Sequence, residues 1–266
     1  MGTGQNRADR ALLIKAVFEA GKLARAHYEL NESEVWNKSN NSPVTDADLA
    51  VNSFLQKALM SARPDYGWLS EETKDDGSRK SKRRVFVVDP IDGTRAFIKR
   101  KPHFVVSVAV IEDGKSVAGA LYNPLTDEAF NAHLGGGASL NGRPITARDS
   151  EQIAAIDMIG YDFKFKALSW PDMHVQARNS MAYRIALVAS AQAHATIAFT
   201  PKCDWDLAAA SLIATEAGAA ITDIDGEPLS FDGDSVINSG VICSGATLHP
   251  LLLSQVKRGP KPPKMN

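Results

Sequence analysis

The stretch Val87-Val88-Asp89-Pro90-Ile91-Asp92-Gly93-Thr94 says most about the fold and the site of this chain. Two aspartates, three residues apart, lie where an apolar strand ends. Pro90 has a fixed φ and no N–H to donate to a sheet, so it ends the strand and bends the chain. Aspartate is rarely buried unless it is paired or binds a metal ion. The bend therefore predicts that Asp89 and Asp92 face one cation.

The residues after the second aspartate predict an anion site beside that cation. Gly93 permits a close approach of the backbone, and Thr94 begins a short helix over Arg95–Lys101. The first turn of a helix has free N–H groups and the positive end of the helix dipole, which suit a phosphate. Carboxylates for a hard cation next to N–H groups for an anion indicate metal-assisted phosphate chemistry. The alternative is an ordinary Asp-Gly turn with a capping threonine, which the preceding apolar strand and second aspartate disfavour.

Three further short motifs with acidic residues occur elsewhere in the chain. Glu71-Glu72 follows the strand Trp68–Ser70, and by itself would be interpreted as a surface pair. Asp204-Trp205-Asp206 opens the helix Leu207–Ala217, where aspartates also act as ordinary caps. Trp205 and the alanines after Asp206 predict that this helix start is buried. Thr45 and Asp48 form a capping box, which is a sufficient structural explanation for both residues.

Hydrophobic periodicity predicts a chain of α+β and α/β character with two regions. The N-terminal region, residues 1–144, holds helices over 11–28 and from Thr45, then an antiparallel sheet with most metal ligands. Asp113-Gly114 and Asn141-Gly142 are type I′ hairpin signals. The C-terminal region, residues 145–266, alternates strands with helices and contains the helix of Asp206. The predicted strands cover 68–70, 85–89, 104–112, 116–122, 128–133, 154–160, 193–197, 220–223 and 236–244, with helices over 180–192 and 205–217, a polar loop over 31–42 and a frayed C-terminal tail.

Composition excludes several protein classes. The 266 residues contain 30 Lys and Arg against 31 Asp and Glu, so the net charge of −1 does not favour nucleic acid or an anionic membrane as a partner. The basic run Arg79–Arg84 is therefore interpreted as a solvated connecting loop rather than a nucleic-acid patch. Cys203 and Cys243 are too few for a disulfide framework or a cysteine-rich zinc site. Without a signal-peptide core or a membrane-spanning run, we expect a soluble, cytoplasmic protein.

In their order and spacing, these motifs resemble the lithium-sensitive, magnesium-dependent phosphatase superfamily. That superfamily contains inositol monophosphatases, 3′(2′),5′-bisphosphate nucleotidases and fructose-1,6-bisphosphatases. The resemblance covers residues 10 to 250 and implies a layered αβαβα fold. The matching segments are Thr45–Asp48, Ser70-Glu71-Glu72, Asp89–Thr94, Gly137–Gly142, Trp205–Ala209 and Glu216-Ala217-Gly218.

The resemblance also implies the role of each site residue. Two or three Mg²⁺ ions would be held by Glu71, Asp89, the carbonyl of Ile91, Asp92 and Asp206. Glu71 and Thr94 would position the attacking water, and Asp48 would orient Thr94. The backbone of Gly93 and Thr94 would hold the phosphate. Lithium inhibition and a homodimer are expected on the same basis.

Two positions separate the branches of the superfamily. The inositol branch has a glutamate seven residues before the aspartate of its Trp-Asp motif, where this chain has Phe199. The bisphosphate nucleotidase branch often has a lysine that reaches a second phosphate, where this chain has Arg184. These residues favour a 3′(2′),5′-bisphosphate nucleotide such as 3′-phosphoadenosine 5′-phosphate as the small-molecule substrate. Inositol 1-phosphate and a broad sugar or histidinol phosphate specificity remain alternatives, as do plain core packing for Phe199 and a solvated position for Arg184.

Two other protein classes fit the sequence less well. A haloacid-dehalogenase-type phosphatase has the motif Asp-x-Asp-Gly-Thr near its N-terminus, whereas here the spacing is Asp-x-x-Asp-Gly-Thr after two predicted helices. A non-catalytic interaction protein would be favoured by a missing ligand, but each expected acidic position is filled.

Overall fold

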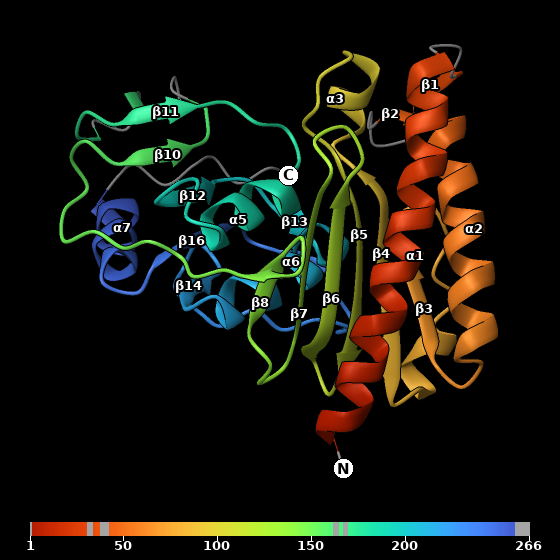
Figure 1. Cartoon of the computed structure of the whole chain (residues 1–266). Helices are drawn as coiled ribbons and strands as arrows, with labels where there is room; N and C mark the ends of the chain where they lie inside the picture. Colours follow the sequence, from red (N-terminus) through yellow and green to blue (C-terminus); the bar gives the residue numbers. More distant parts are fainter. Residues whose placement is uncertain (1, 31–33, 38–42, 162–164, 167–169, 259–266) are drawn as a thin grey trace.

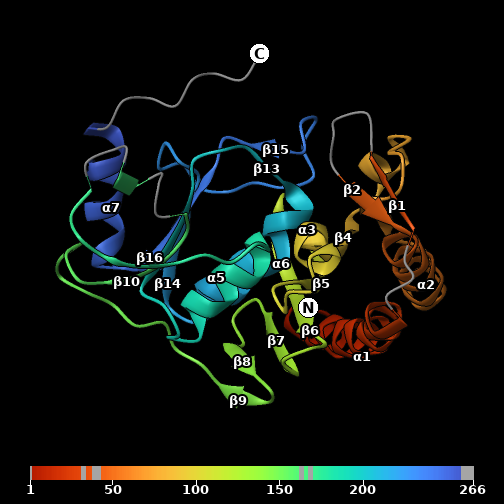
Figure 2. The same cartoon turned by 90° about the horizontal axis from the view of Figure 1, so that it is seen from above.

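The computed structural model describes residues 2–30, 34–37, 43–161, 165–166 and 170–258. They form five layers in the order helix, sheet, helix, sheet, helix. Figure 2 shows α1 and α2 on one side of the larger sheet and α5 and α6 on the other, with α7 at the far edge. The predicted layered αβαβα architecture is confirmed.

The elements of the first two layers, together with the short elements that connect them, come from residues 2–144. They are α1 Gly2–Leu30, β1 Val35–Asn37, β2 Pro43–Thr45, α2 Asp46–Ala62, β3 Gly67–Ser70, the 3₁₀ helix η1 Ser78–Ser81, β4 Arg84–Asp92, α3 Thr94–Ile98, β5 Val105–Glu112, β6 Lys115–Asn123, β7 Glu128–His133, β8 Ala138–Leu140 and β9 Arg143–Pro144.

The second half supplies the middle helices, the smaller sheet and the last helix. Its elements are β10 Asp157–Ile159, β11 His174–Gln176, α5 Met181–Ala189, β12 Ala195–Ala198, β13 Lys202–Cys203, α6 Asp204–Glu216, β14 Ala219–Thr222, β15 Ile237–Asn238, β16 Val241–Gly245 and α7 Leu248–Arg258.

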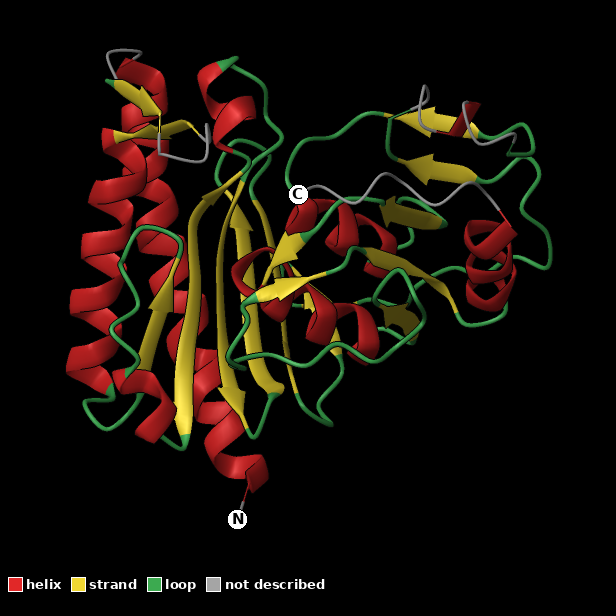
Figure 3. Ribbon diagram, turned by 180° about the vertical axis from the view of Figure 1, so that it is seen from behind, coloured by secondary structure: helices red, strands yellow, loops and turns green. Residues whose placement is uncertain are grey.

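The outer helices α1 and α2 cover one face of the larger sheet (Figures 1 and 3). Leu13, Val17, Ala20 and Ala24 recur at three- and four-residue intervals along α1 and are buried against β5 and β6. The predicted capping box at the start of α2 is confirmed, because Thr45 accepts from the Asp48 amide and the Asp48 carboxylate accepts from the Thr45 amide.

The larger sheet has the strand order β3-β4-β5-β6-β7-β8-β9. β3 is parallel to β4, and the other neighbours are antiparallel. Both predicted hairpin turns are confirmed, with positive φ at Asp113-Gly114 and Asn141-Gly142. The strand predicted to end at Asp89 continues to Asp92, because an irregularity between these two residues carries the pairing past Pro90.

The middle helices α5 and α6 separate the two sheets. α6 contacts β4, β5, β6 and β7 of the larger sheet, as well as α5 and β14. At the closest approach, a Cβ on Gly119 would lie 3.0 Å from the carbonyl oxygen of Ala209, so glycine lets the helix backbone rest on β6. The smaller sheet has the order β11-β10-β12-β16-β14 and mixes parallel with antiparallel pairs; α7 contacts β16.

Several sequence predictions need correction. The strand predicted over 236–244 is divided into β15 and β16, and Gly240 between them has φ +146°. α7 was not predicted, and Lys257 and Arg258 of the expected frayed tail belong to it, whereas residues 259–266 lie outside the described residues. Some of the predicted loop over 31–42 also lies outside the described residues, and β1 occupies another stretch of it.

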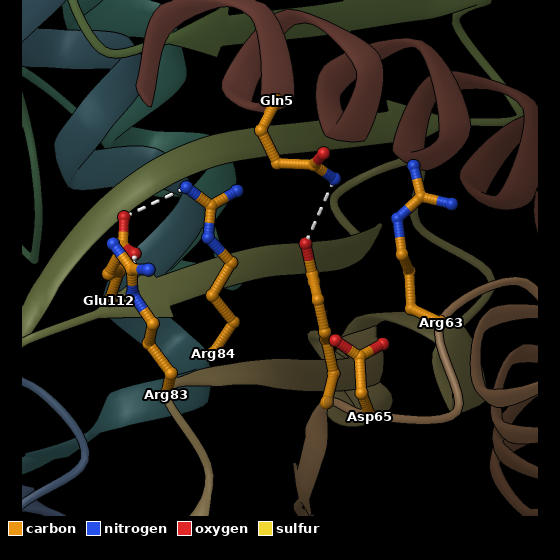
Figure 4. Close-up of a pocket in the computed structure, with 7 residues that line it drawn as sticks. Gln5, Arg63, Asp65, Arg83, Arg84 and Glu112 are labelled. Atoms are coloured by element: carbon orange, nitrogen blue, oxygen red, sulfur yellow. Dashed lines mark hydrogen bonds and ion pairs between the residues drawn. The ribbon is translucent and has the colours of Figure 1, made fainter. Parts of the chain in front are cut away.

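The basic run Arg79–Arg84 is not simply a solvated loop. Arg79 and Arg84 are 1% and 7% exposed, because acidic partners from distant segments cover them. Arg84 donates to Asp9 and to Glu112 at the wall of the pocket in Figure 4. In the described helices, no segment is long and apolar enough to cross a membrane.

Candidate active site

Three carboxylates meet where β4 ends and α6 begins. One oxygen from each of Asp89, Asp92 and Asp206 lies within 4.8 Å of those of the other two. Asp89 and Asp92 are 1% and 7% exposed. The two acidic motifs, 117 residues apart at Asp89 and Asp206 (206 − 89), thus converge on one point.

Neighbouring donors hold each carboxylate in place. Asp92 Oδ2 accepts from Ser180 Oγ at 2.5 Å and from the Ala182 amide at 2.6 Å, both at the start of α5. The Ile91 amide donates to Asp89 Oδ1 at 3.0 Å, and the Cys203 amide donates to Asp206 Oδ2 at 2.9 Å. These bonds orient the side chains but do not neutralise their charge.

Burial and mutual repulsion disfavour the ionised forms of the three groups. Burial raises the pKa of Asp89 well above its ordinary value, and the nearby charges of Glu71 and Asp92 raise it further. The pKa of Asp206 is raised to about 7 by burial and by Asp92. Burial also raises the pKa of Asp92, against the lowering effect of its bonds to Ser180 and Ala182.

This set of donors fits a divalent metal ion. Hard cations such as Mg²⁺ and Ca²⁺ prefer carboxylate and carbonyl oxygens, and a cation would offset the repulsion that raises these pKa values. Among the described residues, Asp89, Asp92 and Asp206 are the ones whose oxygens gather closely enough to share an ion.

Glu71 lies at the edge of this cluster. Its amide donates to the Val88 carbonyl at 3.2 Å, which holds the turn after β3 against the end of β4. Ser70 Oγ donates to Asn52 Oδ1 at 2.6 Å and accepts from the Glu72 amide, which fixes the same turn from α2. The structure does not bring Glu71 into the group of mutually close oxygens, but its charge raises the pKa of Asp89 and of Asp48.

Thr94 and Asp48 meet beside the cluster, as the family resemblance implies. Thr94 Oγ1 lies 3.2 Å from Asp48 Oδ1 and 3.2 Å from the carbonyl oxygen of Ile91. The Thr45 amide and hydroxyl both donate to Asp48 Oδ2, at 2.8 and 2.6 Å. Burial raises the pKa of Asp48 to about 7, although the bonds from Thr45 act in the opposite direction.

Gly93 is required by the geometry of the turn into α3. Its φ is +107°, and a Cβ there would lie 2.7 Å from the carbonyl oxygen of His103. No other residue fits this turn without moving the backbone that carries Asp92 and Thr94.

A small basic pocket lies next to the cluster. Its volume is about 210 Å³, and its wall includes Arg95, Arg184 and Lys202. Arg95 follows Thr94 directly, and the charge of Lys202 lowers the pKa of Asp206, which places the pocket within electrostatic reach of the carboxylates. The remaining wall residues are Tyr161, Phe165, Asn179, Ile197, Ala198 and Thr200.

The two residues expected to select the substrate are placed differently. Arg184 does line the pocket but is 5% exposed, and it donates through Nε to Thr196 and through Nη2 to the carbonyls of Ile159 and Ile197. Phe199 is 8% exposed and stacks edge-on against Phe165 and Trp170, with ring centroids 5.8 and 6.2 Å away. Its described contacts are therefore those of a core residue.

Sequence reasoning did not identify two residues of this region. Ser180 was visible as the cap of the helix predicted over 180–192, but its bond to Asp92 spans 88 residues. Lys202 lies four residues before Asp206, and its basic charge so close to the Trp-Asp motif was the available signal.

Comparison with known proteins gives one consistent result. The chain is 32% identical over 272 residues to an inositol-1-monophosphatase of Rhizobium meliloti, covering 95% of this chain and 97% of that one. It is 33% identical over 214 residues to a 3′(2′),5′-bisphosphate nucleotidase of Escherichia coli, covering 78% and 87%. Among solved structures, the extragenic suppressor protein suhB of Bartonella henselae superposes with a TM-score of 0.83 at 26% identity, covering 95% of this chain and all of that one. The family described as the inositol monophosphatase family matches residues 6–261. This chain therefore belongs to the inositol monophosphatase family.

Proposed function

We propose that this protein is a magnesium-dependent phosphatase that hydrolyses phosphate monoesters. The observation that carries the proposal is the close cluster of Asp89, Asp92 and Asp206 beside the Thr94–Asp48 pair. Two or three Mg²⁺ ions would be held by these three carboxylates together with Glu71 and the carbonyl of Ile91. Bound Mg²⁺ supplies positive charge for the phosphoryl oxygens and makes a water molecule more acidic.

The side chains around the cluster orient the reactants. Thr94 donates its hydroxyl hydrogen to Asp48, so a lone pair of Oγ1 accepts a hydrogen bond from the attacking water. Glu71, at the edge of the cluster, would accept a second hydrogen bond from that water. The amides of Gly93 and Thr94 face the phosphate, because the left-handed Gly93 turns the chain into the first, unbonded turn of α3. Each of these roles needs the geometry that the Gly93 turn fixes.

For the substrate, the leading proposal is a 3′(2′),5′-bisphosphate nucleotide. The basic pocket of Arg95, Arg184 and Lys202 supports it, because a second phosphate is the group that such a pocket would attract. The bisphosphate nucleotidase relative supports it as well. The role first expected for Phe199 is not included in this proposal, because its ring is occupied by Phe165 and Trp170.

Inositol 1-phosphate is the second candidate substrate. The inositol-1-monophosphatase relative matches this chain over a larger share of its length. In addition, the bonds of Arg184 to Thr196, Ile159 and Ile197 leave less of its guanidinium for a second phosphate.

Replacing Asp92 by asparagine tests the metal site. Asp92→Asn keeps the shape and a hydrogen-bond acceptor for Ser180 but removes one charge from the cluster. We expect turnover of any accepted substrate to fall by orders of magnitude, and Mg²⁺ binding in calorimetry to weaken. Asp65→Asn, at the separate pocket of Figure 4, is the matched control and should leave both unchanged. Retention of more than about a tenth of normal turnover, a change of only ~1.4 kcal/mol, would remove Asp92 from the site.

The raised pKa values predict a pH-dependent stability of the metal-free protein. Burial raises the pKa of Asp206 to about 7, so the folded chain binds this proton more tightly than the unfolded chain does. The stabilisation is present in acid and is lost as the pH rises through about 7. In EDTA, raising the pH from 6 to 8 should change the free energy of unfolding of the two proteins by different amounts. The change for the wild type should be less favourable than the change for Asp206→Asn by on the order of 1 kcal/mol.

The comparison with Asp206→Asn is needed because other titratable groups make the fold more stable as the pH rises. Burial lowers the pKa of His133 and His249, so their neutral forms stabilise the fold as the pH rises. Urea unfolding of both proteins at pH 6 and 8 gives the difference. If the stability of the two proteins changes with pH in parallel, folding does not disfavour the ionised form of Asp206 in the metal-free protein.

Lys202 gives the sharpest test of the substrate. Its Nζ lies 3.5 Å from Thr200 Oγ1 and 3.2 Å from the Pro201 carbonyl, so replacing it leaves no buried ion pair behind. Charge-assisted hydrogen bonds contribute roughly 1.5–3 kcal/mol, which corresponds to about 10- to 150-fold. Lys202→Met should lower kcat/KM for 3′-phosphoadenosine 5′-phosphate by that factor and barely change it for inositol 1-phosphate.

The control for this test is Lys99→Met, an exposed lysine after α3 that does not belong to the described pocket wall. An equal loss with both substrates would mean that Lys202 acts on the shared phosphate. A wild type that prefers inositol 1-phosphate would replace the leading substrate by the second candidate and leave the metal chemistry in place.

We also propose a cytoplasmic homodimer. Both cysteines are free thiols, and Cys243 lies in the core, which suits a reducing compartment. The dimer is supported by the family resemblance. Light scattering should give twice the 28.6 kDa of one chain, and a value equal to one chain would contradict it.

A further inference from the structure

Arg79 is a buried charge that the proposed reaction does not use. It lies in η1, in the connection between β3 and β4, and is 1% exposed. A guanidinium is removed from water at a high cost in free energy, so a chain that buries one this completely must supply several acceptors.

The acceptors of Arg79 come from its own connection and from one distant segment. Its Nε donates to Asp75 Oδ2 at 2.9 Å, within its own connection. Its Nη1 pairs with Asp232 Oδ1, and its Nη2 donates to the Gly233 carbonyl at 3.2 Å. Asp232 and Gly233 lie between β14 and β15, so Arg79 ties the larger sheet to the second half of the chain.

The segment held by Arg79 in turn holds the start of α6. The Asp232 amide donates to Asp204 Oδ2 at 2.9 Å, and Asn238 Nδ2 donates to Asp204 Oδ1 at 3.0 Å. Asp204 is 1% exposed, so these two donors hold it in a closed position. Asp204 is the first residue of α6, two residues before the proposed metal ligand Asp206.

On its other side, Arg79 rests on the strand that leads to Glu71. A Cβ built on Gly67 of β3 would lie 2.9 Å from the Cβ of Arg79, so the two backbones are in direct contact. β3 ends at Ser70, immediately before Glu71. Arg79 therefore contacts both the strand before one acidic motif and the loop that fixes the other.

We propose that Arg79 is a positioning residue for the metal site, which sets the spacing between the end of β3 and the start of α6. The inference rests on the proposed function, because it assumes that Glu71 and Asp206 serve the same metal site. Arg79 acts through Asp232 and Asp204, and it touches neither the metal ligands nor the substrate.

The chain contains a matched control only five residues away. Arg84 is also buried, at 7% exposed, and donates to Asp9, Asn6 and Glu112. These partners lie in α1 and at the end of β5, beside the pocket of Figure 4, and none belongs to the acidic motifs. Loss of either arginine removes a buried ion-pair network, but only loss of Arg79 should change the metal site.

The experiment compares Arg79→Met, Arg79→Lys and Arg84→Met. For each full-length protein, urea unfolding in EDTA gives the stability, and calorimetric titration with Mg²⁺ well below the unfolding transition gives the Kd. We expect both methionine variants to lose stability. Arg79→Met should raise the Kd for Mg²⁺ about 3- to 10-fold, less than the about 10- to 100-fold typical for a direct partner of a ligand. Arg84→Met should leave the Kd within about twofold of wild type, and Arg79→Lys should restore some of the affinity.

An unchanged Kd for Arg79→Met, with a wild type that does bind Mg²⁺, would reduce Arg79 to a structural role. An equal rise in Kd for Arg84→Met would have the same consequence. A wild type that binds no Mg²⁺ would contradict the proposed function itself. If Arg79→Met does not fold, Asp232→Asn takes its place. This variant weakens the ion pair with Arg79 but keeps the backbone amide that donates to Asp204. Its Kd for Mg²⁺ should also rise.

Discussion

The repulsion among three crowded carboxylates, two of them buried and the third half-buried, is the constraint around which this structure is arranged. One oxygen from each of Asp89, Asp92 and Asp206 lies within 4.8 Å of the other two, and at this separation each negative charge makes the others less favourable. The chain fixes them by amide and hydroxyl donors, from Ile91, Ser180, Ala182 and Cys203. These donors hold the carboxylates in place, and the charge itself is left for a cation to balance.

The cluster also explains why the layers need accurate spacing. β4 belongs to the larger sheet, while α5 and α6 form the middle layer, so the oxygens of the cluster come from two layers. Gly119 lets α6 approach β6, and Gly93 turns the chain directly after Asp92. A shift of either layer changes the distances between the carboxylates, because these side chains are attached directly to the packed elements or to their ends.

The features predicted correctly from the sequence are local ones. The capping box joins Thr45 to Asp48, three residues along the chain, and each hairpin turn takes two residues. The features that were missed depend on partners far along the chain. Ser180 meets Asp92 across 88 residues, and Arg79 meets Asp232 across 153, so charge patterning alone led to a solvated loop where the chain buries two arginines. Phe199 illustrates the same limit, because its position in a motif could not show that Phe165 and Trp170 would enclose it.

The position of α6 has a consequence for how such a chain can change over evolutionary time. The helix rests on strands of the larger sheet and on α5 and β14, so by packing it belongs to both halves of the molecule, although it is encoded in the second. Exchanging either half with that of a relative would join a new helix surface to an old sheet surface and displace Asp206 from its two partners. We therefore expect that the two halves can be exchanged only together, and that specificity changes more readily by substitution in the pocket walls than by recombination.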